Sequence, residues 1–442
     1  MYWALIDIDN CYASCERVFH PELIGKILVI LSNNDGCVVA RSNEAKRAGI
    51  TEGIPFYQLE EKFPGMEIHA LSSNYELYGN MTDRVMSLVR QAAPSFYRYS
   101  IDEGFCCLSG MEHLDLKAWG EQLHQRILKG LGIPVSIGIA PTKTLAKMAS
   151  KYAKRYPGYH HCCLINSDEK RLKALELFPL EDVWGIGRRN AEKLHSWGDH
   201  SALDFARHTK DWVRKNFTIV GLRTWMELNG MDVILPDDME HVKKKSICTS
   251  RSFPGMIADE DTLLTHISNY AARCAEKLRN QKTVASSIGL FLSTNPFRED
   301  LPQYSNYVGI RMMTPTSSTQ ELVKSARICF NRLYLKGYQY KRAGVIVQDI
   351  SQENAIQTSF IDYDSEKYQK MRRLDKVMDE INRLCGTETL VLGAQQYSQK
   401  DGKGKAAVFA DAIKHDHRTK MPNHTMVGYT CGEMKGKNSL EI

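Results

Sequence analysis

The sequence lacks the features that mark several common classes of protein. No apolar run approaches the roughly 20 residues that a helix needs to span a bilayer, so we expect no membrane segment. The apolar N-terminus meets Asp7 and Asp9 too early for a signal peptide, so the expected location is the cytoplasm. The pattern Gly-x-x-x-x-Gly-Lys-Ser/Thr is also absent, which argues against a P-loop ATPase.

The 12 cysteines have no spacing that would indicate a zinc site or a disulfide framework. No Cys-x-x-Cys occurs, and Cys106-Cys107 and Cys162-Cys163 are adjacent pairs. We therefore expect ordinary reduced thiols.

The chain has 442 residues, enough for about three domains. Its net charge of +6 is unevenly distributed: residues 241–356 hold 16 Lys and Arg against 9 Asp and Glu. Such a basic segment indicates an anionic polymer as partner, although a solvated surface explains the composition about as well.

The order of predicted elements indicates an α/β protein of several domains. In the first part we expect strands at 2–8, 26–31, 37–40, 96–101, 105–108 and 135–139, and helices at 42–48, 80–93, 114–131 and 142–154. Residues 172–230 are predicted to be helical, and the acidic stretch 231–241 to be a linker. After it we expect strands at 251–253, 285–292, 307–312 and 342–347, and helices at 260–280, 320–334 and 367–384.

Acidic residues stand at the ends of two predicted strands. Asp7 closes the first strand, and Asp102 and Glu103 are expected at a hairpin tip. Acids placed at the ends of apolar strands are costly unless they bind something. Carboxylates are the ligands that Mg²⁺ prefers, and two such ions support phosphoryl transfer. An Asp-Glu pair by itself is more often an ordinary turn.

Two motifs around these acids resemble a known family. Residues 7–14 and 100–105 resemble the two catalytic motifs of the Y-family translesion DNA polymerases. Longer runs resemble the UmuC branch, the catalytic subunit of bacterial DNA polymerase V, and the resemblance covers roughly residues 2–360. These runs are 31–38, 40–41, 72–78, 142–147 and 183–189.

The resemblance implies a right-handed polymerase with an α/β palm and fingers, a helical thumb containing a helix-hairpin-helix, and an α/β little finger. The implied ranges are 1–165 for palm and fingers (fingers about 18–78), 166–232 for the thumb, 233–242 for a linker, 243–355 for the little finger and 356–442 for a tail.

The implied activity is error-prone, template-directed DNA synthesis opposite lesions, as in SOS mutagenesis. Asp7, Asp102 and Glu103 match the catalytic acids, and Ile8 matches a residue whose backbone carbonyl binds metal. Two Mg²⁺ ions, replaceable by Mn²⁺, are the implied cofactors. A non-catalytic DNA-damage-binding paralogue and a metal-dependent nuclease are the alternatives.

Further positions match the family's contacts to the nucleotide. Tyr12 stands at the steric-gate position, where a ring crowds a ribose 2′-hydroxyl, and Lys154 matches a lysine that faces the triphosphate. Asn43 and Lys46 replace the Tyr and Arg that related polymerases often have, and a lysine binds phosphate without the bidentate fork of arginine.

Other positions match contacts to primer-template DNA, which touch phosphates without reading sequence. In the helix-hairpin-helix they are Gly185, Gly187, Arg188 and Arg189. In the basic domain the candidates are Lys243, Lys244, Lys245, Arg251 and Arg273.

The implied protein partners are a sliding clamp, a cleaved UmuD-type dimer and a recombinase filament. Residues 357–361 resemble a clamp-binding peptide, with Gln357 followed by Phe360 and Ile361 in place of the usual Leu-Phe. A plain linker is the equal alternative. Residues 396–442 carry eight Lys and Arg against five acids and match the family poorly, so we expect a solvated tail.

Replacing Phe360 and Ile361 together with Ala is predicted to reduce stimulation by the cognate sliding clamp, because such peptides bind through buried apolar anchors. Unaided extension of short primers should be unchanged. Titration of the clamp into both proteins measures the effect, and equal clamp affinities would identify the segment as a linker.

Overall fold

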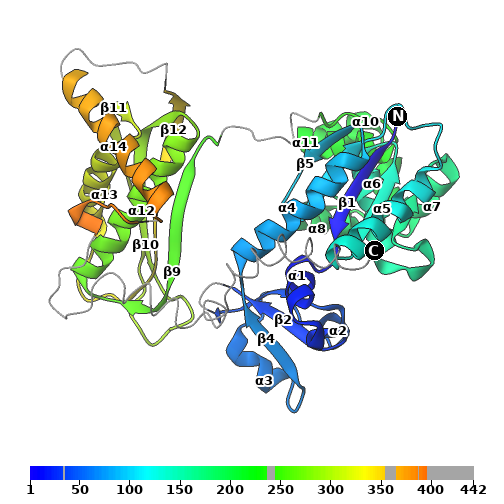
Figure 1. Cartoon of the computed structure of the whole chain (residues 1–442), viewed down its shortest axis with the longest axis horizontal. Helices are drawn as coiled ribbons and strands as arrows, with labels where there is room; N and C mark the ends of the chain where they lie inside the picture. Colours follow the sequence, from blue (N-terminus) through cyan, green and yellow to red (C-terminus); the bar gives the residue numbers. More distant parts are fainter. Residues whose placement is uncertain (33–34, 236–243, 354–364, 387, 396–442) are drawn as a thin grey trace, which may run out of the picture. The chain divides into compact units, whose positions relative to one another are not determined.

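The computed structural model describes residues 1–32, 35–235, 244–353, 365–386 and 388–395 (Figure 1). These residues form two compact units, 1–235 and 244–395. No helix among them is long and apolar enough to cross a membrane.

A mixed five-stranded sheet forms the centre of the first unit, in the order β5-β6-β1-β7-β8. Its strands are β1 (Trp3–Ile8), β5 (Ser95–Arg98), β6 (Glu103–Cys107), β7 (Val135–Ala140) and β8 (Cys162–Leu164). β1 is antiparallel to both β6 and β7. Helices cover both faces of the sheet at this strand, which explains its nearly continuous apolar sequence.

Successive residues of β1 enter two different cores, as strand geometry requires. Ala4, Ile6 and Ile8 pack with helices α4 (Tyr75–Ala92) and α5 (Leu116–Leu131). Trp3 and Leu5 pack on the other face with α6 and the helices that follow it. Those helices are α6 (Lys143–Arg155), α7 (Asp168–Glu176), α8 (Arg188–Ser196), α9 (Ala202–Arg207), α10 (Lys210–Asn216) and α11 (Ile219–Leu228).

A smaller three-stranded sheet follows α1 (Cys11–Phe19) and has the order β3-β2-β4. Its elements are β2 (Ile27–Leu31), β3 (Val38–Arg41), β4 (Ile68–Ser72), α2 (Asn43–Arg47) and α3 (Leu59–Lys62). It has its own core around Val29, Leu31 and Val38.

The second unit is a four-stranded antiparallel sheet with helices on one face. Its strands, in the order β11-β10-β12-β9, are β9 (Ile247–Ile257), β10 (Thr283–Thr294), β11 (Ser305–Thr316) and β12 (Tyr340–Gln352). The helices are α12 (Glu260–Asn280), α13 (Thr319–Leu333) and α14 (Ser365–Cys385). Each strand is longer than the sequence predicted, because polar residues on the outer face interrupt the apolar pattern.

The predicted helix at 367–384 is confirmed as α14, but it is docked rather than part of a loose tail. The Arg279 guanidinium donates to both carboxylate oxygens of Asp379, each at 2.6 Å. The backbone N–H of Thr319 donates to Asp375 at 3.2 Å. These contacts attach α14 to α12 and α13.

In the first unit, two predicted boundaries near the site were wrong. α4 begins at Tyr75 rather than Asn80, because the Asn74 side chain caps it by accepting from the backbone N–H of Leu77. Glu103 is not at the hairpin tip but in strand β6, opposite Asp7. The turn lies just before it, where the Ser100 hydroxyl accepts from the N–H groups of Asp102 and Glu103.

Gly138 on β7 allows α6 to approach the sheet closely. A Cβ atom there would lie 2.0 Å from the Ala146 carbonyl oxygen and 2.1 Å from the Ser150 nitrogen. We predict that Gly138→Ala lowers the free energy of unfolding by about 3 kcal/mol or more, because backbone cannot yield as a side chain can. In Gly130→Ala on α5, the new Cβ meets nothing within 4 Å. The free energy of unfolding should therefore rise by up to about 1 kcal/mol, because Ala is more stable than Gly inside a helix. Urea denaturation of both variants tests this, and equal midpoints would contradict it.

Candidate active site

Three predicted acids converge at one edge of the five-stranded sheet. Asp7 near the end of β1 is the register partner of Glu103 at the start of β6. The backbone N–H of Ile8 donates to the carbonyl oxygen of Asp102 at 3.0 Å, which places that residue beside the same strand end. The Ser100 hydroxyl donates to the Asp102 carboxylate at 2.6 Å. Antiparallel pairing thus brings together acids that are 95 positions apart in the sequence.

The electrostatics of this edge favour a bound cation. Burial is the main cause that raises the pKa of Asp7 to about 6; Lys154 opposes it, and the nearby carboxylates of Glu103 and Asp9 add to it. Two ammonium groups offset the negative charge: Lys154 Nζ lies 3.0 Å from Asp7 Oδ1, and Lys147 Nζ lies 2.8 Å from Glu103 Oε2.

No three His, Cys, Asp or Glu side chains in the described ranges are arranged as a ready-made metal site. At the carboxylate edge, oxygens of Asp7 and Glu103 face lysines instead. The donor set nevertheless fits a hard divalent cation, since it consists of carboxylates and backbone carbonyls. Magnesium usually takes only one or two protein carboxylates and completes its shell with water and substrate phosphates.

Lys154, which the sequence matched to a lysine facing the triphosphate, lies beside the carboxylates. Burial alone would lower its pKa, but Asp7 and Asp9 outweigh burial and hold the pKa of Lys154 above its ordinary value. Asp9 is held in turn by the Ser136 hydroxyl, which donates to its carboxylate at 2.8 Å. The ammonium is therefore charged and fixed at the edge of the acid cluster.

The predicted residues of α2 lie within reach of the same site. Lys46 Nζ donates to the Asn10 side chain at 2.5 Å, and Asn10 donates to Asn43 at 2.9 Å. The pKa of Lys46 is lowered by burial and next by the charge of Lys154, so the two lysines are electrostatic neighbours. Lys46 and Lys154 thus form a positive site beside Asp7.

Tyr12 stands at the start of α1, directly after the Asp7–Asp9 strand end. Its ring stacks on Tyr78 with centroids 4.4 Å apart and meets the edge of Tyr75 at 5.7 Å. The Tyr78 hydroxyl donates to the buried Glu16 at 2.6 Å. Burial raises the pKa of Tyr12 to about 12, so its hydroxyl stays neutral, and the contacts with Tyr78 and Tyr75 hold its ring in place.

The predicted DNA-contact turn precedes α8. Gly185 has φ +96°, and a Cβ atom there would lie 2.0 Å from Thr224 Oγ1, so glycine is required on both grounds. Gly187 caps α8, and Arg188 and Arg189 are exposed at the helix start. The element before the turn is a single 3-10 turn (Leu180–Asp182) rather than a full first helix.

The basic candidates of the second unit differ in their surroundings. Lys244 and Lys245 are exposed just before β9, and Arg251 is exposed on β9. Arg251 lies opposite Ala343, on the sheet face that the helices cover. Arg273 already pairs with Glu276 at 2.9 Å and Glu388 at 3.3 Å, which weakens its case as a phosphate contact.

Sequence reasoning missed the open face of this sheet. Tyr307 lies over Gly289, and Phe291 over Gly344. The Arg342 guanidinium is 5.4 Å from the Phe291 ring centroid. Alternating residues of β11 could have revealed this face, because every second position of a strand points the same way.

Lys243 and the clamp-peptide residues Gln357, Phe360 and Ile361 lie outside the described residues.

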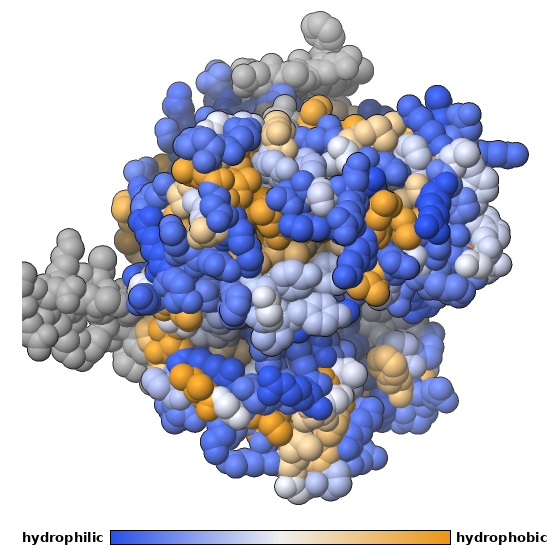
Figure 2. All heavy atoms as spheres, turned by 90° about the vertical axis from the view of Figure 1, so that its right-hand side faces the viewer, coloured by the Kyte–Doolittle hydropathy of each residue, from blue (hydrophilic) through white to orange (hydrophobic). Residues whose placement is uncertain are grey.

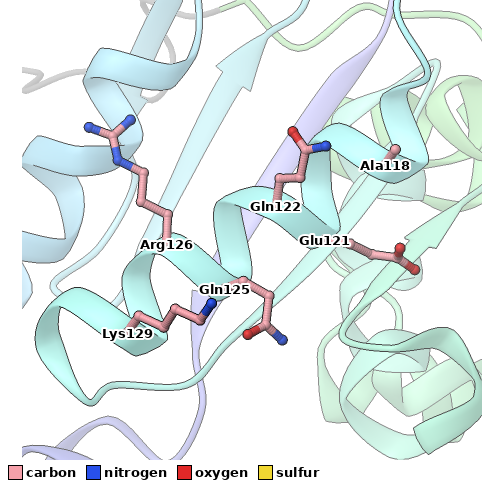
Figure 3. Close-up of a pocket in the computed structure, with 6 residues that line it drawn as sticks. All are labelled: Ala118, Glu121, Gln122, Gln125, Arg126 and Lys129. Atoms are coloured by element: carbon pink, nitrogen blue, oxygen red, sulfur yellow. The ribbon is translucent and has the colours of Figure 1, made fainter.

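A shallow hollow lies elsewhere, on α5, where Ala118, Glu121, Gln122, Gln125, Arg126 and Lys129 line it (Figure 3). All six residues belong to one helix and none is a candidate acid. The face of the first unit in Figure 2 is mostly hydrophilic, with its hydrophobic residues in small separate groups.

Comparison with solved structures supports the class of protein that this site indicates. A Dbh–Dpo4–Dbh chimera of Y-family DNA polymerases is 20% identical, with a TM-score of 0.62, and the match covers 80% of this chain and 100% of the chimera. An insertion ternary complex of Dbh DNA polymerase matches with the same identity and coverage and a TM-score of 0.50. The fold is that of a Y-family DNA polymerase, with palm, fingers, thumb and little finger.

Comparison of sequences narrows the class to a family. Residues 6–151 match the impB/mucB/samB family and residues 244–360 match its C-terminal domain. Protein UmuC of Salmonella typhimurium is 37% identical over 90% of this chain and 94% of its own. Protein ImpB of the same species is 37% identical over 86% of this chain and 90% of its own, and DNA polymerase IV 1 of Halalkalibacterium halodurans is 32% identical over 58% and 62%. The chain belongs to the impB/mucB/samB family.

Replacing Tyr12 with Ala is predicted to raise the incorporation of ribonucleotides relative to deoxyribonucleotides by at least about tenfold, or about 1.4 kcal/mol, because the wall against the 2′-hydroxyl is lost. Tyr12→Phe keeps the ring and should keep the wild-type ratio. Single-nucleotide insertion with matched ribo- and deoxyribonucleotides measures the effect. An unchanged ratio in the Ala variant would remove Tyr12 from sugar selection.

Proposed function

We propose that this chain is an error-prone, template-directed DNA polymerase that inserts deoxynucleotides opposite damaged bases. The observation that carries the proposal is the convergence of Asp7, Asp102 and Glu103 at one strand edge, beside Lys154 and Tyr12. Membership in the impB/mucB/samB family and similarity to a DNA polymerase IV support this activity, with DNA and deoxynucleoside triphosphates as the proposed substrates.

Y-family polymerases depend on a divalent metal, and we infer two Mg²⁺ ions, replaceable by Mn²⁺. The carboxylates of Asp7, Asp102 and Glu103 and the backbone carbonyl of Ile8 would hold them. Bound there, the ions would supply positive charge that neutralises the triphosphate and would favour ionisation of the primer 3′-hydroxyl. The acids contribute negative charge that is already concentrated and partly desolvated at the strand edge.

The nucleotide contacts follow from the lysines and Tyr12. Lys154 and Lys46 would bind triphosphate oxygens as point charges, and Asn43, joined to Lys46 through Asn10, supports that side. Tyr12, backed by Tyr78, would lie against the sugar. Because no residue of this set reads a base edge, template pairing decides which nucleotide enters.

Primer-template DNA would contact both units through its phosphates. In the thumb, the turn with Gly185 and Gly187 brings backbone N–H groups to the surface beside Arg188 and Arg189. In the little finger, Lys243, Lys244, Lys245 and Arg251 remain candidates, and the open face with Phe291 and Arg342 joins them. Arg273 is the weakest, because two glutamates already hold it.

The proposed protein partners are a UmuD-type dimer, a recombinase filament and a sliding clamp. The first two rest on likeness to UmuC, and the third on residues 357–361. DNA and deoxynucleotides are in the cytoplasm of bacteria, from which the similar proteins come, so we propose the same location for this chain.

A metal-dependent nuclease or a non-catalytic DNA-binding protein would be the competing function. A nuclease needs the acids but no ring beside them to exclude a 2′-hydroxyl. A binding protein needs neither the acids nor the lysines that offset them. The acids, the lysines that offset them and the ring of Tyr12 occur together at one site, and this combination favours a polymerase.

The replacement Asp102→Asn is predicted to lower primer extension by at least about 10³-fold, or about 4 kcal/mol, since it removes a charged metal ligand without changing the shape of the side chain. Affinity for primer-template should stay within about twofold, because phosphate contacts elsewhere dominate it. Extension past an abasic site, measured beside DNA binding, tests both the activity and the residue. Wild-type protein that degrades rather than extends primers would overturn the proposal in favour of a nuclease, and a fully active variant would remove Asp102 from catalysis.

A further inference from the structure

Lys147 is a largely buried lysine that ends the matched run 142–147 but was given no role there. It lies on α6, and its Nζ is 2.8 Å from Glu103 Oε2. Only 17% of its side chain and 15% of the Glu103 side chain are exposed. Removing both charges of an ion pair from water costs free energy, and this cost is offset only where other groups hold both partners in place.

Two aromatic rings, Tyr99 and Trp184, hold the ammonium group of Lys147. Its Nζ is 4.6 Å from the Tyr99 ring centroid and 5.6 Å from that of Trp184, both within the range of cation–π attraction. The rings are themselves fixed, because the Trp184 indole N–H donates to the Tyr99 hydroxyl at 3.0 Å and the rings meet edge to face. We call Tyr99 and Trp184 the aromatic pair.

The aromatic pair joins two functional parts of the first unit. Tyr99 directly precedes the Ser100–Asp102 turn that carries one of the catalytic acids. Trp184 belongs to the turn before α8, next to Gly185 and three residues before Gly187. A shift of this turn on binding DNA would therefore move a ring that holds Lys147.

The ammonium of Lys147 restricts the carboxylate of Glu103. A glutamate side chain at a surface samples several rotamers, and ordering it costs about 1–2 kcal/mol of conformational entropy. Because one oxygen of Glu103 accepts a hydrogen bond from a fixed ammonium, the other oxygen is held in a defined position. The same positive charge reduces the repulsion between Glu103 and Asp7.

We propose that Lys147 is a positioning residue for the polymerase reaction: the aromatic pair fixes its ammonium group, the ammonium fixes Glu103, and DNA bound at the turn before α8 adjusts this chain of contacts. The inference rests on the proposed function. It adds a link between the thumb and the catalytic acids that passes through no metal ion.

Lys151, one turn further along α6, offers a matched control. It too pairs with an acid, Asp182 at 3.1 Å, and lies 5.4 Å from an aromatic ring centroid, that of Phe178. Neither of these partners is a candidate catalytic residue. Lys147→Met and Lys151→Met thus remove the same charge from the same helix, but only the first touches the acid cluster.

The first measurement is steady-state insertion of one nucleotide. Lys147→Met should lower kcat at least about tenfold, with the KM for the nucleotide and the affinity for DNA within about twofold of wild type. Lys147→Arg, which keeps charge and ring contact, should recover part of the loss, and Lys151→Met should match wild type. Thermal melting shows whether each variant is folded. A folded Lys147→Met protein with wild-type kcat, or an equal loss in Lys151→Met, would overturn the proposal.

The second measurement requires no metal and no turnover. Protein labelled with 5-fluorotryptophan gives a ¹⁹F resonance for Trp184, which Trp184→Phe identifies. With EDTA present, Lys147→Met should shift this resonance and Lys151→Met should not, and primer-template DNA should shift it in the wild type. An unmoved resonance in Lys147→Met or on adding DNA would reject the link. Failure of the proposed function would appear separately, as wild-type protein that does not extend primers.

Discussion

The first unit depends on the balance between crowded carboxylates and the lysines that face them. Asp7 and Glu103 are register partners on adjacent strands, so neither can move away from the other without breaking the sheet. Burial raises the cost of their charges, as the elevated pKa of Asp7 shows. Lys147 and Lys154 offset this cost in the absence of other cations. We propose that this arrangement keeps the site ready for ions and triphosphate, because the Lys154 ammonium can move away from Asp7 without rearranging the backbone, while Lys147 stays in place beside Glu103.

Helix α6 provides that balance, since it supplies four lysines, and each of them pairs with an acidic residue. Lys143, at its start, is buried over the Trp3 ring and pairs with Asp232, which fixes the chain beyond α11 to the sheet. Lys147 and Lys154 face the acids, and Lys151 faces Asp182. All four can reach their partners because the missing side chain of Gly138 lets α6 lie close against β7. The close packing of α6 against β7 thus helps to place the lysines that offset the charge of the acids.

The second unit follows a different principle, because its helices cover one face of the sheet and leave the other open. Apolar side chains of β10 and β12 point to the helices, while Phe291 and Arg342 point outward. On that face, glycines beneath Tyr307 and Phe291 let the rings lie flat against the strands. Flat rings beside a guanidinium suit a polyanion with exposed sugar and base edges, and they do so without a deep pocket.

Much of the site could be predicted from the sequence, because its acids and Tyr12 stand in short motifs whose strands and turns are set by neighbouring residues. The apolar run before Asp7 dictates a buried strand, and the spacing of Asp102 and Glu103 from it follows from the family resemblance. Only the tertiary structure decided that Glu103 lies in a strand opposite Asp7, that Tyr78 backs Tyr12, and that the Lys147 ammonium lies over the rings of Tyr99 and Trp184. It also decided that Arg273 is already paired. These contacts join residues from separate elements, and a contact between elements is set by how whole faces pack, which no local pattern of residues records.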